Sequence, residues 1–210
     1  MSMLILCAGR SLRALEGPYD SAGFDSAVSA ERDAGIEPYT GRKTDSAQRT
    51  VYTAEGKGAQ ETAGQLLLPS SFFTEPLLNE IPLRSFTDTD KCFPVEKWKR
   101  KAAAQRKAGD PRQPESRAEV TARAEALIEK LECAGGDSLL ISYPLFLAEF
   151  LDRLRTHGYV IQRSGLLKIE PLERIVASKR EEHCGGCGHN CFLANPGCGV
   201  GRDKAMRQRR

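Results

Sequence analysis

Long hydrophobic runs are missing from this sequence, and charge of one sign does not dominate it. No apolar run approaches the roughly 18 residues that a membrane-spanning helix needs. No basic segment precedes the short apolar run at the N-terminus, so we expect no secretory signal peptide. The formal net charge of +3 is small and gives no general argument for binding nucleic acid. These absences predict a cytoplasmic protein that does not enter a membrane.

Histidine is also scarce. Only three of the 210 residues are histidine, namely His157, His183 and His189. Charged residues make up 28% and apolar residues 40% of the chain, which are proportions typical of a globular protein. The length suffices for one α/β domain with a complete hydrophobic core and a small appendage.

The N-terminal segment Leu4–Cys7 is apolar at successive positions, and Gly9 follows it closely. A run that is apolar throughout and too short for a helix is typical of a strand buried on both faces. In α/β folds, ligands bind where such a strand ends and its loop begins. The loop contains Arg10, Ser11 and Arg13 but no histidine, aspartate or glutamate. Arg10 and Arg13 are therefore candidate ligands of an anion, with solvated loop charges as the alternative.

Periodic patterns predict the remaining elements, and these alternate as expected for an α/β fold. The basic helix over residues 95–107 is expected to expose its charges to solvent. The helix over residues 117–132 begins with a capping box, because Glu119 follows Ser116 by three residues. The other predicted segments are helices within 24–34 and over 58–68 and 145–155, strands over 49–53 and 138–142, and a hairpin that pairs 159–163 with 166–169.

Several segments together resemble the histidine phosphatase superfamily, in its phosphoglycerate-mutase-like branch. Residues 4–11 (LILCAGRS) resemble its first strand and Arg-His-Gly-Glu-Thr loop, and residues 54–63 (AEGKGAQETA) resemble its Ser-Pro-Leu-x-Arg-Ala-x-Gln-Thr-Ala segment. Its Leu-Asn-Glu, Glu-Ser-x-x-Glu-Val and Val-Ser-His-Gly segments are matched at residues 78–80, 115–120 and 138–151. The resemblance covers about residues 3–170. It implies a three-layer α/β sandwich with a mostly parallel central sheet and helices on both faces.

The family works by covalent catalysis. One histidine attacks phosphorus, a second histidine and two arginines hold the oxygens, and a carboxylic acid protonates the leaving group. Matched by position, the first arginine falls on Cys7, the nucleophilic histidine on Ala8, the second arginine on Gly58 and the second histidine on Tyr143. Only Glu80 keeps the type of the acid, either as a remnant of function or as a plain surface carboxylate. The resemblance therefore implies a degenerate site without phosphohistidine chemistry.

Cys7 is a weak substitute for the missing nucleophile. Cysteine phosphatases surround the thiolate with a loop of backbone amides that ends in arginine, and residues 7–10 are too few for that loop. A thiol at the end of a buried strand usually stays protonated and inert. We therefore expect a packed core thiol at Cys7. We also expect Tyr143 and Pro144 to fill the space where a phosphate would sit.

Four of the seven cysteines are concentrated near the C-terminus in the pattern C-x2-C-x3-C-x6-C. An odd total without a signal peptide argues against a disulfide framework. Four thiolates in a tetrahedral arrangement form a closed structural zinc site, and they also suit an iron–sulfur cluster. The alternative is a tail of free thiols. The predicted metal ligands are Cys184, Cys187, Cys191 and Cys198, with His183 and His189 as substitutes for one thiolate.

These observations predict two domains and three functional hypotheses. We expect a histidine-phosphatase-like domain over residues 1–175 and a cysteine-rich metal-binding tail over residues 181–210. The first hypothesis is a catalytically inactive protein with a binding or regulatory role, which holds a small anion or a protein partner in the old pocket. The second is a divergent phosphatase or phosphomutase that acts on a phosphorylated small molecule through Glu80, Arg10 and an unrecognised nucleophile. The third is nucleic-acid binding through the basic tail, which has only Phe192 to stack a base.

Overall fold

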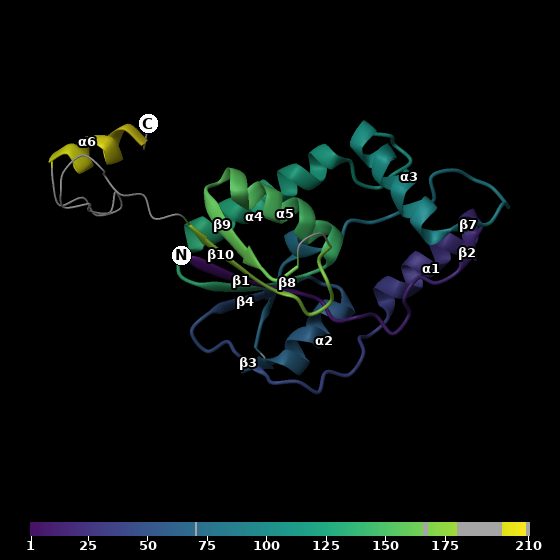
Figure 1. Ribbon diagram of the computed structural model, residues 1–210, viewed down its shortest axis with the longest axis horizontal. Coiled ribbons are helices and arrows are strands. Elements are labelled where there is room, and N and C mark those ends of the chain that lie inside the picture. The colour runs from purple at the N-terminus through teal and green to yellow at the C-terminus, as the bar shows by residue number, and fades with distance from the viewer. Residues whose placement is uncertain (70, 166–167, 180–198, 209–210) are drawn as a thin grey trace. The chain divides into compact units, whose positions relative to one another are not determined.

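The computed structural model describes all residues except 70, 166–167, 180–198 and 209–210 (Figure 1). The chain divides into two compact units, Met1–Ser178 and Lys179–Arg210. The predicted metal ligands Cys184, Cys187, Cys191 and Cys198 lie outside the described residues. In the second unit, residues 199–208 form helix α6 (Gly199–Gln208).

A mixed β-sheet forms the centre of the first unit. Its described strands lie in the order β6–β4–β8–β1–β10–β9. Strands β6, β4, β8 and β1 are parallel to their neighbours, whereas β10 pairs with β1 in the antiparallel direction. The strand bounds are Ser2–Cys7 (β1), Thr50–Thr53 (β4), Phe73–Thr74 (β6), Ser138–Ser142 (β8), Tyr159–Arg163 (β9) and Arg174–Lys179 (β10).

Helices cover both faces of this sheet, which confirms the predicted α/β sandwich. Helix α2 lies on one face, and α4 and α5 lie together on the other (Figure 1). Helices α1 and α3 extend beyond the ends of the strands (Figure 1). The helix bounds are Ser21–Asp33 (α1), Lys57–Leu66 (α2), Val95–Ala108 (α3), Arg117–Ala134 (α4) and Pro144–Thr156 (α5).

Shorter elements complete the first unit. Two small sheets pair β2 with β7 and β3 with β5, and the 3-10 helix η1 precedes the Leu-Asn-Glu segment. No helix in the described ranges is long and apolar enough to cross a membrane. The bounds are Pro18–Tyr19 (β2), Thr44–Asp45 (β3), Leu67–Leu68 (β5), Phe93–Pro94 (β7) and Pro76–Leu78 (η1).

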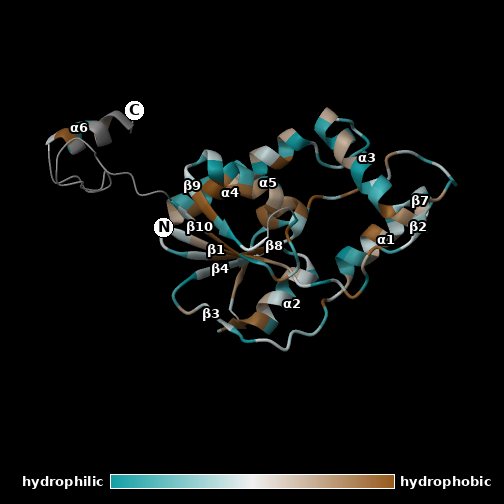
Figure 2. Cartoon of the chain, in the orientation of Figure 1, coloured by the Kyte–Doolittle hydropathy of each residue, from teal (hydrophilic) through white to brown (hydrophobic). Residues whose placement is uncertain are grey.

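Local sequence signals account for where the main helices begin and end. Helix α4 starts with the predicted capping box, in which the Ser116 hydroxyl accepts from the Glu119 N–H and the Glu119 carboxylate accepts from the Ser116 N–H. After α5, Gly158 has a φ of +80°, a left-handed conformation that glycine adopts without steric cost. Hydrophobic and hydrophilic residues alternate along α3, α4 and α5 (Figure 2), so each helix buries one face and exposes the other.

Two predicted elements are wrong in detail. Strand β9 does pair within the sheet, and its neighbour there is β10 (Arg174–Lys179). Of the predicted partner segment 166–169, residues 166–167 lie outside the described residues and residues 168–169 form no strand. Residues 174–179 were not expected to form a strand, yet Ile175 and Ala177 alternate into the core because the free edge of β1 accepts them. Helix α2 stops at Leu66, two residues early, since Leu67 and Leu68 pair with β3 instead.

Candidate functional site

The predicted site positions converge on one cavity of about 710 Å³ at the carboxyl ends of β1 and β8. Its walls come from the loop after β1, the first turns of α2 and α5, helix α1 and the segment after η1. Residues far apart in the chain meet there because parallel strands end at the same edge of the sheet. The sequence-predicted residues that line the cavity are Cys7, Ala8, Arg10, Gly58, Glu80 and Tyr143.

Cys7 and Ala8 lie at the end of β1 and offer no nucleophile at neutral pH. Cys7 is 1% exposed and Ala8 is 3% exposed. Burial, with smaller contributions from Glu80 and two other carboxylates, raises the pKa of the Cys7 thiol to about 12. The thiol therefore stays protonated, and a protonated thiol attacks phosphorus poorly.

Tyr143 occupies the space at the first turn of α2. Its hydroxyl oxygen accepts a hydrogen bond from the Ala59 N–H at 3.1 Å. Gly56, the N-cap residue of α2, has no side chain to cap that helix, and a Cβ placed there would lie 2.3 Å from the Tyr143 hydroxyl oxygen. The phenol thus takes a position at a helix N-terminus that an anion would otherwise favour.

Glu80 caps the first turn of α5. Its carboxylate accepts hydrogen bonds from the N–H groups of Phe146 at 2.9 Å and Leu145 at 3.3 Å, while the N-cap residue Tyr143 makes no side-chain cap. Burial nevertheless raises the pKa of Glu80 to about 7, against the lowering effect of these N–H groups and of the Arg123 charge. A carboxyl with this pKa exchanges protons at neutral pH, as an acid or base catalyst must.

Cationic side chains outnumber acidic ones around the cavity. Arg10, Arg32, Arg84 and Lys99 line it, against the carboxyl groups of Asp25, Glu31 and Glu80. Burial raises the pKa of Glu31, which lowers its tendency to ionise. The rest of the lining is largely apolar, with Val28, Ile36, Ile81, Leu83 and Leu145 among its members. A cavity of this character suits an organic anion that has an apolar body.

Other predicted residues lie elsewhere. Arg13 is exposed and is not among the residues that line the cavity. His157 follows α5 and binds the carboxylate of Glu125, whereas His183 and His189 lie outside the described residues. Within the described ranges, no group of three or more metal-ligating side chains is assembled.

Sequence analysis missed three of the cavity's four cations, namely Arg32, Arg84 and Lys99. Arg84 belongs to a segment that showed no pattern, although it stands only four residues after Glu80. Lys99 belongs to the basic helix whose charges were expected to face solvent, but it lines the cavity instead. The proximity of Arg84 to the Leu-Asn-Glu segment was the one signal that pointed to it.

A search of solved structures finds phosphatases whose folds are similar to this chain. A phosphoserine phosphatase from Entamoeba histolytica superposes with a TM-score of 0.46 and 13% identity, covering 74% of this chain and 80% of that one. A mycobacterial glucosyl-3-phosphoglycerate phosphatase gives a TM-score of 0.44 and 16% identity over 73% and 78% of the two chains. These neighbours belong to the histidine phosphatase superfamily, which the sequence resembles. No family model and no curated protein sequence matches the chain.

Proposed function

We propose that this protein binds a small organic anion in the cavity and does not form a phosphohistidine. One observation carries the proposal: Ala8 stands at the expected position of the nucleophile, in a cavity that still has four cationic side chains. A methyl group cannot attack phosphorus, and the neighbouring Cys7 thiol is protonated. Binding without covalent chemistry is the function that this combination supports best, with a regulatory role as its consequence.

The test is calorimetric titration of the protein with phenyl phosphate, with phenol and inorganic phosphate as controls. We expect phenyl phosphate to bind more tightly than either fragment, because the cavity contacts both its charge and its ring. The recovered ligand should be intact, and the protein should carry no acid-labile phosphate. Absence of binding by phenyl phosphate would show that the proposal is wrong.

A divergent phosphatase is the second candidate, and the pKa of Glu80 near 7 is the observation that favours it. In that case an unrecognised nucleophile or a water molecule attacks phosphorus, the bond to the leaving oxygen breaks, Glu80 protonates that oxygen, and Arg10 and other cavity cations hold the phosphate. Release of phosphate that disappears in Glu80→Ala would establish this alternative over simple binding. Turnover unaffected by Glu80→Ala would point to a contaminating enzyme.

We also propose that the C-terminal cysteines bind zinc, with an iron–sulfur cluster as the alternative. The support is the spacing of Cys184, Cys187, Cys191 and Cys198, since four thiolates match the donor set of a structural zinc site. Elemental analysis and a visible spectrum of protein purified without oxygen distinguish the two. Zinc without colour supports the first, iron with sulfide and visible absorption supports the second, and absence of metal refutes both.

Binding of nucleic acid by the basic tail is the remaining alternative. It requires RNA binding that weakens as salt increases and that is lost when residues 184–210 are deleted. If the same deletion left phenyl phosphate binding intact, ligand binding by the cavity would be independent of the tail.

A further inference from the structure

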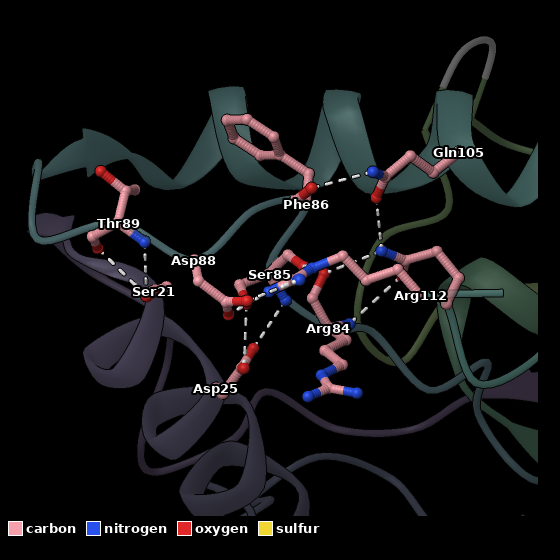
Figure 3. A network of polar contacts seen from close by, with 10 residues as sticks. Ser21, Asp25, Arg84, Ser85, Phe86, Asp88, Thr89, Gln105 and Arg112 are labelled. Carbon is pink, nitrogen blue, oxygen red and sulfur yellow. Dashed lines mark hydrogen bonds and ion pairs between the residues drawn. The ribbon is translucent and has the colours of Figure 1, made fainter. Parts of the chain in front are cut away.

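Side chains bind the backbone of Arg84 and of the two residues after it (Figure 3). The side-chain amide of Gln113 binds both backbone groups of Arg84: its oxygen accepts from the Arg84 N–H at 3.3 Å, and its nitrogen donates to the Arg84 carbonyl at 3.1 Å. Gln113 is 5% exposed, so these bonds form away from water. The amide nitrogen of Gln113 also donates to the side-chain oxygen of Gln105.

Ser85, the next residue, is held from two sides. Its N–H donates to the Asp25 carboxylate at 2.6 Å, and its hydroxyl donates to the second oxygen of the same carboxylate at 3.0 Å. Its carbonyl accepts from Arg112 Nε at 2.6 Å. The carbonyl of Phe86 then accepts from Gln105 Nε2 at 2.8 Å. Side chains from α1, α3 and the loop before α4 thus meet on three consecutive residues (Figure 3).

So many side-chain hydrogen bonds to the backbone are unusual for a segment outside helices and strands, because the backbone N–H and carbonyl groups of surface loops normally bind water. Holding the segment costs conformational entropy in each contributing side chain, including the long side chains of Gln105, Arg112 and Gln113. The structural consequence is a defined starting point for the side chain of Arg84. In Figure 3 the Arg84 guanidinium points away from the network.

Arg84 is exposed and lines the cavity, and its guanidinium makes no hydrogen bond or ion pair with any described residue. The guanidinium of Arg112, by contrast, already donates hydrogen bonds to Ser85 and forms an ion pair with Asp88. A guanidinium presents parallel N–H groups that fit the two oxygens of a phosphate or a carboxylate. Positioning such a group in advance removes part of the entropic cost of binding.

We infer that Arg84 binds the anionic group of the ligand and that Gln113 is its positioning residue. This inference rests on the proposed function and names the recognition element of the same cavity. The ligand class is an organic phosphate or carboxylate with an apolar body. The charge lies against Arg84, with Lys99 of α3 as a further cation of the same cavity, and the body lies against the apolar lining.

The experiment compares Arg84→Gln with the wild type, using phenyl phosphate, benzoate and the neutral benzyl alcohol as ligands. We expect Arg84→Gln to weaken the binding of the anionic ligands by about tenfold or more, because a hydrogen-bonded charge is lost. The affinity for benzyl alcohol should not change. Arg13→Gln is the matched control and should bind like the wild type, since Arg13 is exposed and outside the cavity. Comparison of phenyl phosphate with benzoate identifies which anion the site prefers.

The positioning role is tested with Gln113→Met, which keeps the length of the side chain but removes its hydrogen bonds. We expect weaker phenyl phosphate binding, unchanged benzyl alcohol binding, and no further loss when Gln113→Met is added to Arg84→Gln. Gln113→Leu, which is also neutral and without hydrogen-bonding groups, serves if Gln113→Met does not fold. If Gln113→Met weakened the binding of benzyl alcohol and of phenyl phosphate equally, Gln113 would have only a structural role.

The outcomes separate the two proposals. If the wild type binds phenyl phosphate and Arg84→Gln binds it equally well, the inference about Arg84 is overturned while the proposed function stands. If the wild type does not bind phenyl phosphate or benzoate, the proposed function falls and the inference falls with it.

Discussion

Two features of its surroundings have opposite effects on the protonation of Glu80. Its carboxylate satisfies the first N–H groups of α5, which favours the ionised form, and burial at the cavity wall favours the neutral form. Burial is the larger effect, so the pKa of Glu80 is raised to about 7. The same property that makes Glu80 a costly cap makes it sensitive to pH in the physiological range.

The first prediction concerns the pH dependence of stability. Ionising Glu80 is harder in the folded than in the unfolded protein, so its cost appears as pH rises above the unfolded pKa and is complete above about 7. Between pH 5 and pH 8 we expect the wild type to lose about 2 kcal/mol of unfolding free energy relative to Glu80→Gln. Urea unfolding at both pH values measures this difference. Glu129→Gln, an exposed change on α4, is the control, and parallel profiles for the wild type and Glu80→Gln would contradict the prediction.

The second prediction concerns the thiols. Alkylation by iodoacetamide requires an accessible thiolate, and Cys7 is buried with a raised pKa, whereas Cys92 and Cys133 are exposed. In native protein at neutral pH, peptide mapping by mass spectrometry should find Cys92 and Cys133 modified and Cys7 intact. Cys7 should become modified only in denaturant. Modification of Cys7 in the native protein as fast as Cys92 would mean that the thiol is activated after all.

At this scale, sequence reasoning located the residues that belong to local patterns. Ala8, Glu80 and Tyr143 were placed by matching their segments to the motifs of the family that the sequence resembles, and they do meet in one cavity. Arg84 and Gln113 were missed because their relation is made by folding: they stand 29 residues apart and neither belongs to a periodic segment. No local signal encodes a side-chain amide that binds a distant backbone.

Among the elements, those with their own start and stop signals were predicted well. Strands β1 and β8 and helix α4 follow from apolar runs and a capping box, all of which act over a few residues. Strand β10 was missed because its alternation is weak by itself and its stability comes from pairing with β1, at the other end of the domain. In β10, pairing with a distant strand determines the secondary structure, and the local sequence pattern does not.

The third prediction concerns the attachment of η1 to α4. Arg123 makes a two-fold ion pair with Glu115, donates to the carbonyls of Leu77 and Asn79, and lies 4.4 Å above the Phe146 ring. Arg123→Met leaves these partners unsatisfied in a site where the arginine is 15% exposed. We expect a loss of about 2–4 kcal/mol in unfolding free energy, measured by chemical denaturation.

Arg155 provides the matched control for that change. It also forms an arginine–carboxylate pair, with Asp152, but the pair is exposed on the surface of α5. Arg155→Met should cost less than about 0.5 kcal/mol, because exposed pairs contribute little. Equal effects of the two substitutions would show that the network around Arg123 is not what holds η1.

For the whole molecule, the division into two units leads to a fourth prediction. Every described core residue belongs to Met1–Ser178. Deletion of residues 184–210 should therefore leave the midpoint of thermal unfolding within about 2 °C of the full chain, measured by calorimetry. The same deletion should abolish any zinc that the protein binds through the proposed cysteine site. A large fall in the midpoint would mean that the tail stabilises the first unit.

The pairing of β1 with β10 has a consequence for how the protein is made. Ser2 pairs with Ser178, so β1 leaves the ribosome long before β10, its partner on one side. Its partner on the other side, β8, also follows it by more than a hundred residues. The nascent chain therefore keeps an apolar strand unpaired until both partners have been made, which favours slow closure of the sheet and recruitment of chaperones.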